Sequence, residues 1–187
     1  MKKLLITFFI FLFCLTSSVG WSLEFKDLVK RDGRMYKKFN YFPFNGKITG
    51  QYRGTLKNGK EDGSWDLYYF NGQLESKGNF KNGKKEGSWV HYHENGQLES
   101  KGSFKNGNME GSWVSYYYNN GKLNYKGNFK NHKKEGSWVR YFDNGQLKEK
   151  GDWKNGKEEG SWVYYNRYGT IYKRLTGTYK DGKRISD

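Results

Sequence analysis

The stretch Lys77–Leu98, which reads KGNFKNGKKEGSWVHYHENGQL, decides the fold of this 187-residue chain. Two segments of alternating polar and apolar residues flank Asn82-Gly83, and a second Asn-Gly follows at Asn95. Asn-Gly between alternating segments is the strongest short signal for a β-hairpin, because a type I′ turn needs positive φ at both central residues. The stretch therefore predicts one antiparallel unit of two strands and two turns.

The unit recurs along most of the chain. Gly-Ser-Trp occurs five times, at spacings of 24, 24, 25 and 24 residues, and Asn-Gly occurs nine times. Asn131-His132 and Tyr168-Gly169 fill equivalent slots, and the extra residue of the longer spacing falls in 116–121, where we expect a turn. A period of this length indicates an array whose units cannot bury a face alone.

The composition fits a thin sheet rather than a globular enzyme. Aromatic residues make up 19% of the chain, whereas aliphatic residues are scarce and the mean hydropathy is −1.06. A chain this polar resembles a disordered one, but disordered chains are poor in aromatics. The supply of Leu, Ile and Val excludes the deep core of an α/β enzyme, so stacked rings must hold the sheet together.

Side chains alternate with a period of two, so each strand has two distinct faces. After each Trp, Val and Tyr recur on one face, while the Trp lies on the other and the position between them varies. Gly78 and its equivalents Gly102, Gly127 and Gly151 predict close approach of a neighbouring ring over bare backbone. The glycines of Gly-Ser-Trp, such as Gly87, are expected to serve tight turns.

The recurring pattern Gly-x-[Phe/Trp]-Lys-Asn-Gly-Lys-x-[Asp/Glu]-Gly-x-Trp-x-x-Tyr-x-x-Asn-Gly resembles the MORN repeat, specifically the bacterial MORN-variant type. The resemblance implies an all-β, elongated and curved antiparallel β-hairpin repeat array, with no helical domain after the signal. It also implies contacts with proteins or phospholipids. Five full copies fall at about 54–176, and half copies at each end extend the array over 46–187. Residues 23–45 are expected to form an N-terminal cap or linker.

Residues 1–22 have the layout of a secretory signal peptide. A basic start, Met1–Lys3, precedes the apolar run Leu4–Leu15, which is too short to span a ~30 Å hydrocarbon core comfortably. Cleavage after Gly20 or after Ser22 fits the small residues there; an uncleaved membrane anchor is the less favoured alternative. We therefore expect a bacterial protein that is exported to the periplasm or the exterior, with no cysteine in its mature chain.

No catalytic, cofactor or metal site is predicted. Carboxylates recur at one slot before Gly-Ser-Trp, and this recurrence favours a structural role beside turns over catalysis. The recurring carboxylates are Asp62, Glu86, Glu110, Glu135 and Glu159. His91 and His93 could form a metal pair on one strand face, but no third ligand recurs nearby. We therefore expect the chain not to be an enzyme.

The basic residues are the functional lead, since 34 Lys+Arg against 19 Asp+Glu give a formal charge of +15. Lysines recur on the polar face of the second strand and again before the turns. The two rows are Lys77, Lys101, Lys126 and Lys150, and Lys81, Lys105, Lys130 and Lys154. A ladder with one charge every ~10 Å could meet an anionic surface, or could serve solvation and edge protection alone.

These observations predict a non-enzymatic repeat scaffold for protein–protein interaction, in the bacterial envelope or outside the cell. It would bind an unidentified protein through its aromatic face or its edge. The alternative is a binder of anionic phospholipid or envelope surfaces that works through the repeated lysines. Nucleic acid fits the charge but not export, so it is disfavoured. The oligomeric state is left open.

Overall fold

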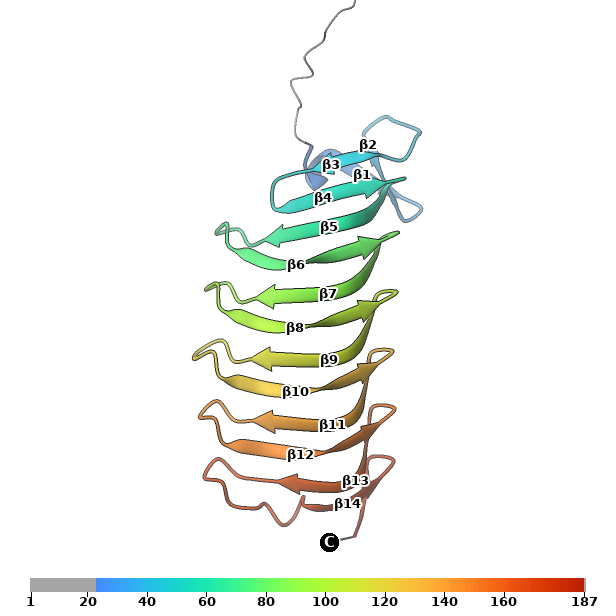
Figure 1. Cartoon of the computed structure of the whole chain (residues 1–187). Helices are drawn as coiled ribbons and strands as arrows, with labels where there is room; N and C mark the ends of the chain where they lie inside the picture. The colour runs from blue at the N-terminus through green and yellow to red at the C-terminus, as the bar shows by residue number, and fades with distance from the viewer. Residues whose placement is uncertain (1–22, 187) are drawn as a thin grey trace, which may run out of the picture.

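The structure, a computed structural model, describes residues 23–186. Thirteen strands, β3 to β15, form one open antiparallel sheet in chain order, and β1 and β2 form a separate hairpin at its N-terminal end (Figure 1). The expected all-β hairpin array is confirmed. The expected signal segment, 1–22, lies outside the described residues. Within those residues, no helix has the length and apolar character needed to cross a membrane.

The elements are short and regular. Their bounds are η1 Phe25–Asp27 (3₁₀), β1 Leu28–Arg31, β2 Arg34–Lys37, β3 Gly46–Ile48, β4 Tyr52–Lys57, β5 Lys60–Tyr68, β6 Leu74–Lys81, β7 Lys84–Tyr92, β8 Leu98–Lys105, β9 Asn108–Tyr116, β10 Leu123–Lys130, β11 Lys133–Tyr141, β12 Leu147–Lys154, β13 Lys157–Tyr164, β14 Gly177–Lys180 and β15 Lys183–Ser186. Each strand of the large sheet pairs only with the strands that precede and follow it in the chain.

Two kinds of turn alternate along the array, on opposite edges of the sheet (Figure 1). At the short turns both central residues have positive φ, as at Asn82 (52°) and Gly83 (78°). This is the expected type I′ geometry, and it holds even at Asn131-His132, where φ is 50° and 66°. Asn and His are among the residues that most readily adopt this left-handed conformation.

The other edge carries longer loops, and the expectation of a type I′ turn is wrong there. In the loop between β7 and β8, Gly96 has positive φ (82°) and donates its N–H to the His93 carbonyl at 2.8 Å. Asn95 is not left-handed; its Oδ1 accepts the Gln97 N–H at 3.0 Å. The loop between β9 and β10 absorbs the extra residue as expected, because Gly121 bonds back four residues to Tyr117.

The glycines of Gly-Ser-Trp do not lie in turns, which corrects that expectation. Gly87 lies inside β7 with φ of +67° and no atom within 4 Å of an added Cβ. The pairing of β6 with β7 explains the positive φ of Gly87, since Lys77 pairs with Val90 but Asn79 pairs with Glu86. One residue of β6 therefore faces three of β7, a bulge that recurs in every repeat and bends the strand.

The bulge folds each Trp ring back over the neighbouring strand. An added Cβ on Gly78 would lie 2.3 Å from Trp89 Cδ2, so the predicted close approach is confirmed. The Trp89 Nε1–H donates to the Asn79 carbonyl at 3.1 Å, and the side chain is fully buried. Its ring meets Phe80 edge to face at 5.1 Å. Edge-to-face pairs of this kind run along the sheet and supply the core that aliphatic residues do not.

The N-terminal end is closed by residues before β3. Leu23 pairs with Ile48 in a parallel bridge, and the Phe25 ring lies 5.6 Å from that of Trp65. These contacts cover the first edge of the sheet, and Leu28 completes the small core behind it. At the other end β15 is exposed along its whole length.

Candidate functional site

The sheet has two faces that differ in how strictly they repeat. On β6, Ser76, Gly78 and Phe80 point to the side covered by the tryptophans, which we call the Trp face. Lys77 and Lys81 point to the opposite side, which we call the Lys face. This alternation places every predicted lysine on the Lys face.

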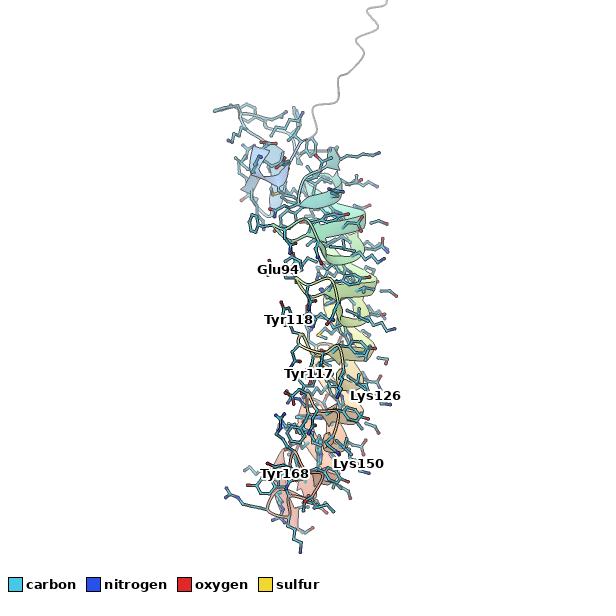
Figure 2. The ribbon with its side chains drawn as sticks, turned by 90° about the vertical axis from the view of Figure 1, so that its left-hand side faces the viewer. Glu94, Tyr117, Tyr118, Lys126, Lys150 and Tyr168 are labelled. Carbon is cyan, nitrogen blue, oxygen red and sulfur yellow. The ribbon has the colours of Figure 1, made fainter. Side chains whose placement is uncertain are left out.

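All eight predicted lysines are exposed. In Figure 2, Lys126 and Lys150 project from one side of the ribbon, away from the side that carries the β1–β2 hairpin. Lys126 pairs across the sheet with Val139, and Lys150 pairs with Val163, so apolar residues separate the charges. The structure therefore assembles both rows into one basic face.

The structure adds a third basic column that the sequence reasoning did not place. Across each short turn the lysine before the turn pairs with the residue after it, as Lys81 does with Lys84. The same pairing joins Lys130 to Lys133 and Lys154 to Lys157. The signal for this was present in the recurring Lys-Asn-Gly-Lys, because a two-residue hairpin turn sets its flanking residues directly opposite each other.

The recurring carboxylates are structural, as expected. Glu86 Oε2 accepts the backbone N–H of Asn106 at 2.8 Å, and Glu135 Oε2 accepts that of Asn155 at the same distance. Each carboxylate thus supports the short turn of the next repeat. This contact places a negative charge beside the lysines of the short-turn edge.

The Trp face carries a line of cross-strand pairs whose chemistry changes from strand to strand, which we call the variable row. Its members, in order, are Tyr52, Leu67, Ser76, His91, Ser100, Ser115, Tyr125, Arg140, Glu149 and Tyr164. The row is apolar at its N-terminal end, small and polar in the middle, and charged and aromatic towards its C-terminal end. Sequence reasoning found half of it, as the varying position two residues after each Trp.

A second line on the Trp face also varies. It lies beyond the aromatic rings, at the position four residues before each Trp. Its members are Glu61, Lys85, Met109, Lys134 and Glu158. The constant rings therefore lie between two lines of non-repeating side chains.

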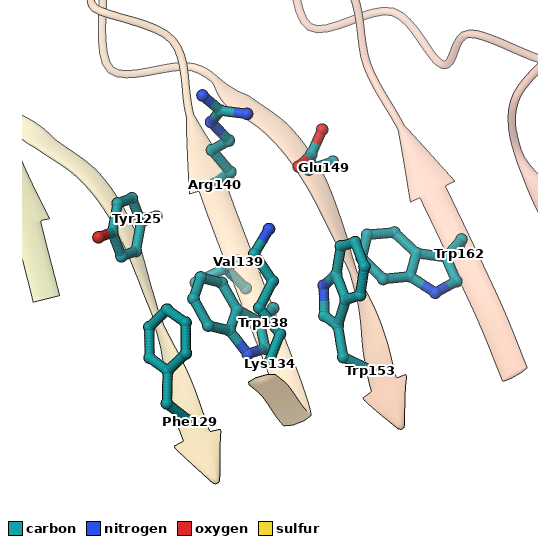
Figure 3. Close-up of a pocket in the computed structure, with 9 residues that line it drawn as sticks. All are labelled: Tyr125, Phe129, Lys134, Trp138, Val139, Arg140, Glu149, Trp153 and Trp162. Atoms are coloured by element: carbon teal, nitrogen blue, oxygen red, sulfur yellow. The ribbon is translucent and has the colours of Figure 1, made fainter. Parts of the chain in front are cut away.

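Members of both lines, with the rings between them, surround a hollow of about 180 Å³ near the C-terminal end of the Trp face (Figure 3). Lys134 crosses it, with its Nζ 4.2 Å from the Trp153 ring centre and 4.7 Å from that of Trp138. Arg140 and Glu149 stand side by side on adjacent strands at its rim. A second hollow of about 370 Å³ lies at the other end, lined mainly by apolar groups around Leu67.

Burial perturbs several titratable groups on the Trp face. It lowers the pKa of Lys134 and of Lys85, because an ammonium over aromatic rings loses hydration. It also raises the pKa of Tyr164, whose hydroxyl in addition donates to Glu158 Oε1 at 2.7 Å. These groups are arranged as neighbours in a packed surface.

The two histidines have separate structural roles. His91 stacks on the Trp89 ring at 5.9 Å, and burial together with Lys85 lowers its pKa to about 4. His93 Nε2 contacts the Tyr116 carbonyl of the next repeat at 3.2 Å. Within the described residues, no three His, Cys, Asp or Glu side chains gather in a way that could hold a metal ion.

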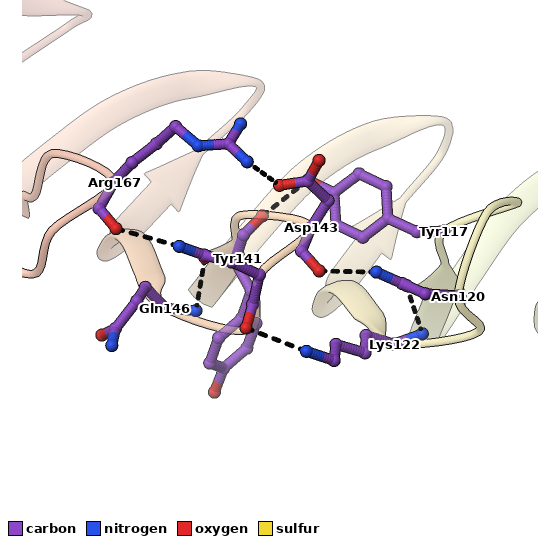
Figure 4. A network of polar contacts seen from close by, with 8 residues as sticks. Tyr117, Asn120, Lys122, Tyr141, Asp143, Gln146 and Arg167 are labelled. Atoms are coloured by element: carbon purple, nitrogen blue, oxygen red, sulfur yellow. Dashed lines mark hydrogen bonds and ion pairs between the residues drawn. The ribbon is translucent and has the colours of Figure 1, made fainter.

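The long-loop edge is tied together by amide side chains (Figure 4). Asn120 Nδ2 donates to the Asp143 carbonyl at 2.6 Å, and Asn144 Nδ2 donates to that of Arg167 at 3.0 Å. The Tyr117 hydroxyl likewise donates to the Tyr141 carbonyl at 2.7 Å. This edge is therefore engaged in holding repeats together, and its exposed parts are single side chains of the loops, such as Glu94, Tyr118 and Tyr168, labelled in Figure 2.

Fold and surfaces together define an open β-hairpin repeat array with one constant basic face and one variable aromatic face. The MORN repeat variant family matches four consecutive segments, residues 61–82, 85–106, 114–131 and 134–155. The chain is therefore a MORN-repeat protein. This is a non-catalytic repeat family, generally found in proteins that interact with other proteins or with membranes and phospholipids.

Wider comparisons add little to this assignment. No curated protein matches the chain. One solved structure that matches, the crystal structure of a GtfA/B complex bound to UDP and GlcNAc, has a TM-score of 0.22 and 9% identity. The match covers 82% of this chain and 26% of that one, so the chain spans about a quarter of its length. At this TM-score the likeness carries no argument about function.

Proposed function

We propose that the chain is a non-enzymatic scaffold that binds a protein partner along its Trp face, in the bacterial envelope or outside the cell. The variable row is the observation that carries this proposal. Its ten paired positions cross β4 to β13, a length of about 43 Å at ~4.8 Å per strand. A partner that follows the row would be apolar opposite Leu67 and charged opposite Arg140 and Glu149.

The physical reason is that a variable row can fix the position along the array at which the partner binds. A partner that contacts only constant positions can bind equally well one repeat further along, because every repeat offers the same groups. Side chains that differ between repeats remove this degeneracy, since a shifted partner would leave charges unpaired and apolar groups exposed to polar ones. A face of this kind therefore suits a partner that must be held at one position.

The test compares two faces of the same molecule. The double variant Arg140→Glu with Glu149→Arg exchanges two neighbouring charges and keeps the net charge, while Lys126→Glu changes the Lys face. Cross-linking capture from the native envelope should lose its partner at least tenfold with the double variant and keep it with Lys126→Glu. Equal capture by all three proteins, or a loss confined to Lys126→Glu, would refute the proposal.

The Lys face supports a second candidate function, binding to an anionic membrane or envelope surface. The eight lysines of its two predicted rows recur in every strand pair from β6 to β12 and all are exposed, so each repeat adds the same two positive charges. Vesicles of phosphatidylglycerol should bind the wild type at low salt and release it as salt rises. The variant Lys101→Glu with Lys126→Glu should bind several-fold less. Absence of binding at low salt would eliminate this candidate.

Export completes the proposal and rests on the sequence pattern of 1–22. The apolar run Leu4–Leu15 and the small residues after it support cleavage after Gly20 or Ser22. Mass spectrometry of the protein recovered from periplasmic and extracellular fractions measures this directly. A full-length chain found only in the cytoplasm would contradict it.

A further inference from the structure

The loop between β2 and β3 turns three aromatic side chains into solvent. Phe39 is 100% exposed, Tyr41 89% and Phe42 79%, within four consecutive residues. An aromatic ring normally gains stability by burial, as the five tryptophans of Gly-Ser-Trp do in the same sheet. Adjacent rings left in water indicate a surface that is covered when the protein acts.

The loop holds these rings outward through defined contacts. Phe39 has φ of +61°, a left-handed conformation that is uncommon for a bulky residue. The Asn40 N–H donates to the Lys37 carbonyl at 3.1 Å, and Asn40 Oδ1 accepts the Phe42 N–H at 2.9 Å. The Arg31 guanidinium donates to the Asn40 carbonyl. The outward rings are thus part of a built loop.

The surroundings of the loop are strongly basic. Residues 28–45 contain five basic side chains and one acidic one. The basic residues are Lys30, Arg31, Arg34, Lys37 and Lys38. Two of them immediately precede Phe39, and the Lys37 ammonium lies 5.4 Å from the Phe44 ring centre. Aromatic rings flanked by lysines match the chemistry of a lipid headgroup layer, where rings occupy the interface and cations meet anionic lipids.

The loop lies at the N-terminal end of the array, the end at which Leu23 enters the structure (Figure 1). We propose that the segment Phe39–Phe42 inserts into the interface of an anionic lipid bilayer, with Lys37 and Lys38 against the headgroups. The site is separate from the variable row and from the eight lysines of the Lys face.

A local reporter tests the proposal in the mature chain that begins after Ser22, so that the apolar run Leu4–Leu15 cannot bind lipid itself. Residues 23–187 contain no cysteine, and a polarity-sensitive dye is attached to Phe42→Cys. The matched control is Phe70→Cys, because Phe70 is 97% exposed at a loop of the other edge. With vesicles of phosphatidylglycerol and phosphatidylethanolamine, the dye at position 42 should shift to the blue and be quenched by a lipid-borne quencher. The dye at position 70 should not respond.

Further variants and vesicle compositions distinguish insertion of this loop from binding through the Lys face and from self-association. Adding Phe39→Ser to the reporter should reduce the shift at least threefold, and phosphatidylcholine vesicles should give a smaller shift than anionic ones. Adding Lys101→Glu with Lys126→Glu should leave the shift at position 42 intact, even if it weakens the Lys face. No co-sedimentation with anionic vesicles, or equal shifts at positions 42 and 70, would overturn the proposal. A shift that grows with protein concentration in the absence of lipid would also overturn it, because the loop would then bind a second copy of the chain.

Discussion

Replacing Gly102 with alanine tests the central packing contact of the array. An added Cβ would lie 2.2 Å from both Cδ2 and Cε2 of Trp113, far inside van der Waals contact. The indole cannot slide away, because its Nε1–H donates to the Ser103 carbonyl at 3.2 Å. Its ring also meets those of Phe104 at 5.2 Å and Phe129 at 6.1 Å. The methyl group must therefore push a buried Trp out of its site.

The expected loss of stability follows from the packing of Trp113 that the added methyl group disrupts. Overpacking a tight core costs about 1–3 kcal/mol, and loss of a buried Trp contact costs about 3–5 kcal/mol. Without the ring, alanine would be the better strand residue than glycine by about 0.5–1 kcal/mol. We expect Gly102→Ala to lower the free energy of unfolding by about 3–5 kcal/mol, measured by urea denaturation followed through Trp fluorescence.

Two comparisons make the reasoning refutable. Gly111 has φ of +69° and open space around its Cβ, so Gly111→Ala should cost only about 1–2 kcal/mol, from backbone strain. In a Trp113→Ala background, Gly102→Ala should be neutral or slightly stabilising. If Gly102→Ala costs no more than Gly111→Ala, or costs the same with and without Trp113, the ring-over-glycine contact does not hold the array.

Three further predictions concern contacts between repeats and pH. Glu110→Ala removes the acceptor of the Asn131 N–H, now at 3.0 Å, so that amide should exchange faster and stability should fall by about 1 kcal/mol, measured by hydrogen exchange and denaturation. Phe142→Tyr adds a hydroxyl at the position where Tyr69 and Tyr117 bond to the next repeat, so it should donate to the Tyr165 carbonyl. The free energy of unfolding should rise by about 0.5–1 kcal/mol, seen as a higher melting temperature. The pKa of His91 is lowered to about 4, so its neutral form stabilises the fold above pH ~6.5 and this contribution is lost as pH falls towards 4. His91→Asn should flatten that part of the pH profile; an unchanged profile would refute the assignment.

Sequence reasoning reached the constant parts of this fold because they depend on local chemistry. Asn82-Gly83 specifies its own type I′ turn, and Gly78 shows by its lack of a side chain that something must approach it. Asn95-Gly96 is the same dipeptide but lies in a longer loop, in which the Asn95 side chain accepts the Gln97 N–H. Nothing in the dipeptide distinguishes the two, since the loop length between paired strands decides which turn closes them.

The misplaced glycines and the variable row have a common cause. The recurrence of Gly87 and its equivalents indicates a left-handed backbone, which suggests a turn. The bulge that requires this conformation is defined by the pairing of β6 with β7, which the sequence does not show. In the same way, His91 and Ser100 become neighbours in one row only once the register is known. Positions that vary carry no periodic signal, so cross-strand register is the information that the sequence alone lacks.

The division of the sheet into a constant and a variable face also determines what kind of partner each face can serve. The constant lysines offer the same charge at every step, which suits a uniform surface such as a lipid headgroup layer and cannot define a position along it. The variable row defines a position. Some of its members, such as His91 and Tyr125, also stack on the tryptophans, whereas Arg140 and Glu149 take no part in the ring pairs or the turn-carboxylate contacts that hold the array. Changes at Arg140 or Glu149 should therefore alter recognition with little loss of stability, whereas a change at any one bare glycine should damage the array without touching a partner.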